Sequence, residues 1–206
     1  MKKVKLILSL LALLQLACTK DDDKKTDLVQ GSLIGKTYYV VQAGDLQRTE
    51  TSVSGTGSIV FNSPLGSIPS KDNYALNLSV DDGGTLELVT HSDSSLANGV
   101  SVLLKRTGSS LTASLKAKGQ ESTAKELSGV NAAEDISLAI DVHNDETPAH
   151  ILVWSAAGGD FGEDNALLNS EEDETSPGNG SGTSWGLILT KANVSSALLE
   201  DPKFVE

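Results

Sequence analysis

The sequence is poor in the side chains on which most enzymes and nucleic-acid-binding proteins depend. Its 206 residues include one cysteine, three histidines and 4% aromatic residues. A single cysteine excludes an internal disulfide, and so few histidines leave little material for acid–base catalysis. Acidic side chains outnumber basic ones, 28 to 16, which gives a formal charge of −12. Such a surface repels nucleic acid and anionic lipid headgroups, so we expect neither as a ligand.

The one cysteine, Cys18, follows a short segment of basic and then apolar residues. The basic part, 1–5, precedes an apolar run, 6–14, that is too short to span a bilayer. This layout resembles the type II signal peptide of bacterial lipoproteins, although Gln15 stands where that family prefers leucine. The resemblance implies a signal peptide over residues 1–17, cut before Cys18, and acyl chains such as palmitate on the cysteine. The alternative is an ordinary secreted protein with a free thiol.

Residues 18–34 form the next segment, which we expect to be a disordered tether. Its first part, Thr19–Asp27, contains no apolar residue and so cannot bury itself. Lys20–Asp23, a lysine followed by acidic residues, resembles the surface-export signal of Bacteroidota-type lipoproteins; a soluble spacer has the same composition. The resemblance implies a protein anchored by lipid in the outer membrane and facing the cell surface.

Residues 35–206 have the length of a single domain and consist of short alternating runs. Apolar residues alternate with small or polar ones from Ile136 to Val142, which is the period of a β-strand. Turn residues separate these runs at the spacing typical of an antiparallel β-sandwich, so we expect an all-β fold. Further strands are expected at Thr37–Gln42, Ser58–Asn62, Ala75–Val80, Thr85–Val89, Val100–Leu104, Leu111–Leu115, Ile151–Ser155 and Trp185–Thr190.

The connections between these runs carry their own signals. Asp81–Gly84, between two alternating runs, predicts a tight hairpin turn. Within the polar connection 116–135, a turn of helix is expected around Thr123–Leu127, and Asn193–Glu200 predicts a short helix. The longest connection, 156–183, is acidic and then rich in glycine and serine. Loops of this length are usually functional or disordered, so we place the binding site here.

The order of the segments from 72 to 191 resembles the concanavalin A-like jelly roll of lectins and glucanases. A hairpin of Leu96–Arg106 and Ser109–Gly119 is followed by two neighbouring strands within Ile136–Ser155 and a closing strand, Trp185–Val194. The resemblance implies that the strand ending near Asp141 lies in the curved sheet of that fold. It rests on strand order without a diagnostic motif, so it supports the fold more than the function.

The sequence does not support catalysis. The glucanase pattern Glu-x-Asp-x-x-Glu is absent, since the dense acidic cluster Glu171–Glu174 has another spacing and lies in a predicted loop. Gly178–Gly182 does not match the Gly-x-Ser-x-Gly elbow of serine hydrolases. His91, His143 and His150 are too far apart in the sequence to suggest a metal trio, although the last two are spaced to face each other across a hairpin. We therefore expect a protein that is not an enzyme.

Calcium is the cofactor that the sequence suggests. Asp160, Asp164 and Glu171 stand at positions one, five and twelve of a loop that echoes an EF-hand. Gly162 and Asn165 depart from that pattern at positions three and six, and no helices flank the loop. The alternative is a solvated acidic loop without a metal.

Trp185, which follows the glycine- and serine-rich segment, is the main candidate for contact with a ligand. Aromatic faces stack on sugar rings, and Asn165 and Asp173 of the same loop are candidate polar contacts. Trp154 lies within a predicted strand and is assigned to the core. The sequence thus favours a surface-anchored, non-catalytic module that binds a glycan or a protein. The alternatives are an adhesive or structural surface protein without a small ligand and, third, a polysaccharide-degrading enzyme.

Overall fold

The computed structural model describes residues 39–49, 52–61, 71–156, 161–173 and 178–200, and almost all of its regular structure is β-strand. The expected all-β antiparallel fold is confirmed. One short 3₁₀ turn, η2 (Glu163–Asn165), accompanies the strands. The strands are β1 (Tyr39–Arg48), β2 (Val53–Phe61), β3 (Lys71–Ser92), β4 (Val100–Thr107), β5 (Ser110–Ala117), β6 (Gln120–Glu121), β7 (Lys125–Glu126), β8 (Ile136–His143), β9 (His150–Ser155), β10 (Leu168–Asn169) and β11 (Ser184–Glu200).

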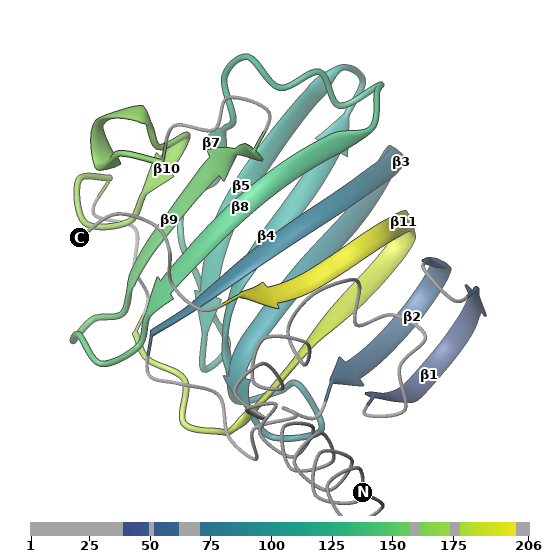
Figure 1. Cartoon of the computed structure of the whole chain (residues 1–206), viewed down its shortest axis with the longest axis horizontal. Helices are drawn as coiled ribbons and strands as arrows, with labels where there is room; N and C mark the ends of the chain where they lie inside the picture. Colours follow the sequence, from purple (N-terminus) through teal and green to yellow (C-terminus); the bar gives the residue numbers. More distant parts are fainter. Residues whose placement is uncertain (1–38, 50–51, 62–70, 157–160, 174–177, 201–206) are drawn as a thin grey trace, which may run out of the picture. The chain divides into compact units, whose positions relative to one another are not determined.

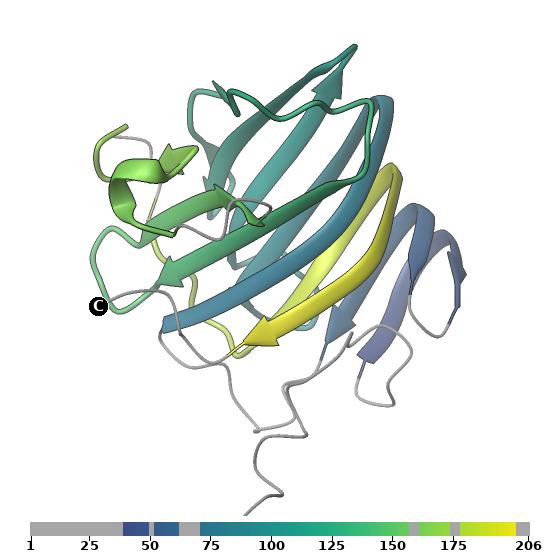
Figure 2. The ribbon, with the colours of Figure 1, turned by 45° about the horizontal axis from the view of Figure 1, so that its top comes forward.

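Two long strands, β3 and β11, connect the two sheets of the sandwich. The first half of β3 pairs with β8, which pairs with β9 and through it with β10; we call this the β8 sheet. The second half of β3 pairs with β4, which pairs with β5; we call this the β4 sheet. β11 runs antiparallel to β3 along both halves, from the Ser184–Ser92 pair to the Glu200–Asn73 pair. Figure 1 shows the two sheets as layers, and Figure 2 shows β3 and β11 side by side.

Asp81–Gly84 does not form the predicted hairpin turn. The two halves of β3 on either side of this segment lie in different sheets and do not pair with each other, and β11 pairs with both, at Val80–Ala192 and at Thr85–Thr190. The segment is therefore an irregularity in the β3–β11 ladder, with residues 81–84 opposite Lys191, at the bend between the sheets. Glycine is needed there because a Cβ on Gly84 would lie 2.7 Å from the backbone oxygens of Thr190 and Lys191.

The alternating run of β8 has its predicted faces, but both faces are buried. Ile136, Leu138, Ile140 and Val142 belong to the main core between the sheets. On the opposite face, Ala139 packs with Leu152 and Trp154 in a second apolar cluster, against which Ala156, Phe161 and Ala166 pack. The indole of Trp154 donates a hydrogen bond to the carbonyl of Gly162 at 3.0 Å, so Trp154 is a core residue, as expected.

Both predicted helical segments are strands in the structure. Residues 125–126 of the segment Thr123–Leu127 form β7, which pairs with β5. Asn193–Glu200 is the second half of β11. A register shift between Val194 and Ser196 places Val194 and Ala197 in the core three residues apart, and this spacing imitates helical periodicity. The described residues contain no helix that is long and apolar enough to span a bilayer.

Candidate metal centre

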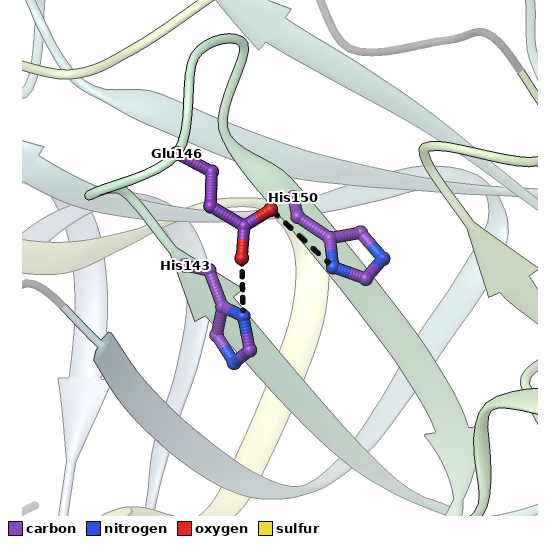
Figure 3. Close-up of side chains that lie close together, drawn as sticks. All are labelled: His143, Glu146 and His150. Carbon is purple, nitrogen blue, oxygen red and sulfur yellow. Dashed lines mark hydrogen bonds and ion pairs between the residues drawn. The ribbon is translucent and has the colours of Figure 1, made fainter.

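The hairpin of β8 and β9 brings two histidines and a glutamate together at its end. His143 closes β8 and His150 opens β9, and the two residues are cross-strand partners, as their spacing predicted. Glu146, from the connection between the strands, lies between the two rings (Figure 3). Its carboxylate oxygens are 3.2 Å from Nδ1 of His143 and 3.9 Å from Nδ1 of His150. The ligand atoms of the three residues all lie within 4.8 Å of one another, so they form a candidate metal site.

Each imidazole ring also contacts an oxygen atom through Nε2, the nitrogen that is not directed at Glu146. Nε2 of His143 lies 2.9 Å from Oδ2 of Asp141, two residues earlier on the same face of β8. Nε2 of His150 lies 3.0 Å from Oδ1 of Asn169 in β10. His150, Asp141 and Asn169 are all buried, so these contacts are shielded from water. Burial raises the pKa of Asp141, and the nearby His143 opposes this shift.

The connection that carries Glu146 is held in place by the segment after residue 178. The backbone N–H of Gly180 donates to Oδ1 of Asn144 at 2.9 Å, and the amide of Asn144 donates back to the carbonyl of Gly180 at 3.1 Å. The amide of Asn179 donates to the carbonyls of Asn144 and Glu146. Gly182 donates to the carbonyl of His91 at 2.7 Å, so this segment is packed against β3.

A surface pocket of about 370 Å³ adjoins the metal site. Glu146 and His150 belong to both, so a molecule in the pocket lies next to the candidate metal ligands. The lining combines carboxylates with small apolar groups, and pockets of this size hold small ligands. It consists of Glu146, Thr147, Pro148, Ala149, His150, Ser170 and Glu171.

The structure separates the residues that the sequence assigned to calcium and to the ligand. Asp160 lies outside the described residues, so the calcium trio as a whole stays a prediction. Asp164 and Asn165 are exposed in η2, whereas Glu171 is exposed in the wall of the pocket. Asp173 accepts hydrogen bonds from Lys125 and from the backbone N–H of Asn169, so its carboxylate is engaged in contacts within the protein.

The predicted role of Trp185 in ligand contact is contradicted. Its side chain is 0% exposed. The ring stacks on Phe61 with centroids 4.2 Å apart, and Tyr74 packs against it at 5.0 Å. A ring enclosed in this way has no exposed face on which a sugar ring could stack. The sequence placed Trp185 at the surface because it follows a glycine-rich segment, but Gly180 and Gly182 of that segment pack closely on β3.

Glu146 is the site residue that the sequence analysis missed. The histidine pair was visible from the hairpin pattern, and the segment His143–His150 has Glu146 as its fourth residue. A glutamate in a hairpin connection is ordinarily a solvated charge, so its position between the rings depends on how the connection folds. Asn169 was missed because its contact with His150 joins β10 to β9, whereas the contact of Asp141 with His143 follows from the alternation of β8 and was overlooked.

A second polar cluster is buried between the sheets. Thr90 donates to Oδ2 of Asp72 at 2.8 Å, and the hydroxyl of Tyr74 donates to the same carboxylate. Nδ1 of His91 is 3.6 Å from the other oxygen of Asp72. Burial raises the pKa of Asp72 to about 7, although the hydrogen bonds from Tyr74 and Thr90 oppose the shift. This carboxyl group is therefore poised between its charged and neutral forms near neutral pH.

Comparison with solved structures identifies the fold. The carbohydrate-binding module CBM66 from Bacillus subtilis matches with a TM-score of 0.52 and 14% identity, over 80% of this chain and 93% of that one. The exoplasmic/lumenal domain of VIP36, in its Ca²⁺/Man2-bound form, matches with a TM-score of 0.53 and 14% identity, over 82% of each chain. The fold is the concanavalin A-like jelly roll.

An enzyme also occurs among the similar structures. A β-glucanase from Bacillus licheniformis matches with a TM-score of 0.53 and 8% identity, over 80% of this chain and 92% of that one. At such identities the likeness establishes the fold alone. No protein-family model and no curated protein sequence matches this chain. The function therefore has to be argued from the chain's own site.

Proposed function

We propose that this protein is a surface-anchored, non-catalytic module that binds a glycan in the pocket at the end of the β8–β9 hairpin. The observation that carries the proposal is that pocket, lined by Glu146, His150 and Glu171 beside the histidine pair. Support comes from the fold, which is shared with a carbohydrate-binding module and with a VIP36 domain in a Man2-bound form.

The lining suits a sugar better than an apolar ligand. Sugar hydroxyls donate hydrogen bonds to carboxylates, and such bonds to a charged group contribute about 1.5–3 kcal/mol each. Glu146 and Glu171 supply two carboxylates, both on exposed side chains. Pro148, which is exposed, adds apolar surface on which the C–H face of a sugar ring can pack.

The surface location belongs to the same proposal. Cys18 and the segments 1–17 and 18–34 lie outside the described residues. We propose that residues 1–17 are a lipoprotein signal peptide, that Cys18 is acylated, and that a tether joins it to a domain over 35–206. Acyl chains on Cys18 would hold the domain at the outer membrane, where it would meet extracellular polysaccharides.

Glycan binding is tested with a glycan array and with Glu171→Gln, which removes a charge from the pocket wall but leaves the metal cluster intact. We expect the wild type to retain one class of glycan and the variant to bind it about 10–100-fold more weakly. Glu134→Gln, an exposed carboxylate outside the pocket, is the matched control and should bind like the wild type. If no glycan is retained, or if Glu171→Gln binds equally well, the pocket is not a glycan site.

A further inference from the structure

We infer that His143, Glu146 and His150 bind a divalent transition metal of the zinc class, through Nδ1 of each imidazole and the glutamate carboxylate. The inference does not depend on the proposed glycan binding, because it rests on the donor atoms of these three side chains and on the contacts that orient the two rings. It also departs from the calcium that the sequence suggested.

The hydrogen-bonding partner of His143 determines which of its nitrogens can bind a metal. Nε2 faces the carboxylate of Asp141 at 2.9 Å, and a carboxylate only accepts hydrogen bonds, so Nε2 carries the proton. In the neutral ring, Nδ1 then has its lone pair free for a metal and directs it toward Glu146, 3.2 Å away. A carboxylate behind a histidine in this way is the usual support of a zinc ligand.

The same arrangement occurs at His150. Nε2 faces Oδ1 of Asn169 at 3.0 Å. The backbone N–H of Glu171 donates to that oxygen at 3.2 Å, so the amide of Asn169 is oriented with its oxygen as the acceptor. Nε2 of His150 therefore donates, and Nδ1 presents its lone pair on the side of Glu146, 3.9 Å from the carboxylate.

Two lone pairs thus face one carboxylate, and this arrangement is repulsive unless a cation lies between them. Protons on both rings are one solution, and a metal ion is the other. Zinc takes nitrogen and carboxylate ligands at about 2.0–2.2 Å, which places donor atoms of a tetrahedral site about 3.3–3.6 Å apart. The carboxylate oxygens already lie 3.2 Å and 3.9 Å from the two nitrogens, and all three donors lie within 4.8 Å of one another, so a modest contraction of the cluster brings them to this spacing.

Calcium does not fit this donor set. Calcium takes six to eight oxygen ligands, whereas two of the three donors here are imidazole nitrogens. Imidazole suits zinc, copper, nickel and iron. The two rings are also held rigidly, each by a second contact, which favours a small site of defined geometry over the flexible oxygen cage of a calcium site.

The experiment titrates the metal-free protein with ZnCl₂ and, separately, with CaCl₂ at matched ionic strength and without any sugar. We expect one zinc ion per chain by calorimetry and an increase in melting temperature of roughly 5–10 °C at zinc a hundred times its dissociation constant. Calcium at the same concentration should leave the melting curve unchanged. Co²⁺ should give a visible absorption spectrum with nitrogen ligands, which reports on coordination directly.

Two ligand variants, one variant of a supporting residue and one control test the assignment. Glu146→Gln, at an exposed position that does not threaten folding, should weaken zinc binding at least about 10-fold, and His143→Ala should abolish the cobalt spectrum. Glu134→Gln removes an exposed carboxylate elsewhere and should bind zinc like the wild type. Asp141→Asn weakens the support of His143 and should reduce affinity while keeping the stoichiometry.

Several results would overturn the inference. These are a melting curve that zinc does not change, an equal response to calcium, and zinc binding that Glu146→Gln leaves unaltered. If zinc does not change the melting curve, protons on the two imidazole rings alone balance the charge of Glu146. Because no sugar is present in these titrations, their failure is independent of the array result with Glu171→Gln.

Discussion

Lys125 of β7 forms an ion pair with Asp173, with Nζ 2.7 Å and 2.9 Å from the two carboxylate oxygens. The same carboxylate accepts the backbone N–H of Asn169 at 3.2 Å, and Asn169 in turn holds the ring of His150. The ion pair thus joins the edge of the β4 sheet to the support of a proposed metal ligand.

Lys125→Met should weaken zinc binding several-fold while it changes stability little. An ion pair with a partly exposed lysine contributes only about 0–1 kcal/mol to folding, but its loss frees Asp173 and loosens Asn169. Calorimetry of zinc binding and a urea denaturation curve measure the two effects separately. Lys105→Met, an exposed lysine of β4, is the control. A loss of stability without a loss of affinity would show that the ion pair supports the fold alone.

Asp72 should make the protein less stable as the pH rises toward 7. Burial raises its folded-state pKa to about 7, above the ordinary value of 3.8. Between these values the unfolded chain has released the proton while the folded chain retains it, so the free energy of unfolding falls with rising pH. The total effect is a few kcal/mol, since one pKa unit corresponds to about 1.4 kcal/mol.

Urea denaturation between pH 4 and 8, with the wild type and Asp72→Asn, measures this effect. The variant keeps the shape of the side chain without the titration, so its stability should depend less on pH. Asp141, His143 and His91 lie near Asp72 and contribute to the pH profile of both proteins. Parallel profiles for the two proteins would exclude Asp72 as the titrating group.

Substitutions along β8 should reveal a strand that is buried on both faces. Leu138→Asp and Ala139→Asp should both unfold the domain, because each would bury an unpaired carboxylate at a cost of several kcal/mol. Ser137→Asp should be tolerated, since its side chain is only partly buried and lies beside Asn77. Circular dichroism and urea curves compare the three. If Ala139→Asp is as stable as Ser137→Asp, the second apolar cluster does not cover the strand.

Gly182→Ala should destabilise the packing of the segment after residue 178. An added Cβ would lie 1.9 Å from the backbone of Ser92, so either β3 or the segment must move. Overpacking of this kind costs about 1–3 kcal/mol. Ser181→Ala, at the exposed neighbouring position, should be neutral. Thermal denaturation compares the two, and equal melting temperatures would contradict the close contact.

Cys18→Ser should release the protein from membranes. The expectation comes from the sequence alone, in which the single cysteine follows a basic and then apolar segment. Removing the thiol removes the site of acylation and with it the stable anchor. Detergent phase partition of cell extracts measures the effect. A variant that enters the detergent phase as the wild type does would contradict the lipoprotein assignment.

Much of the fold could be predicted because local alternation and burial agree. The run Ile136–Val142 and the hairpin of β4 and β5 lie where the period of two places them. Asp81–Gly84 has the composition of a hairpin turn, but its structure depends on β11, which is more than 100 residues away in the sequence. Asn193–Glu200 was misread because a bulge alters its period. Sequence patterns report local geometry, and the bend of this sandwich is set by distant partners.

The site was predicted only in part, for a related reason. His143 and His150 face each other because they are cross-strand partners in the β8–β9 hairpin, and the spacing of the hairpin in the sequence predicts this register. Glu146 enters the site because distant loops hold its connection through Asn144 and Asn179. Trp185 was assigned to the surface because a glycine-rich neighbour usually indicates an exposed loop. Here glycine permits close packing instead, so the tryptophan lies in the core.

The passage of β3 and β11 through both sheets has a consequence for how the protein unfolds. Since the two layers share their central strands, neither can separate as an independent cooperative unit while the other persists. Trp154, on the outer face of the β8 sheet, and Trp185, in the main core, should therefore lose their fluorescence environment in the same transition. The architecture thus couples the stability of the hairpin that carries the metal ligands to the stability of the whole sandwich.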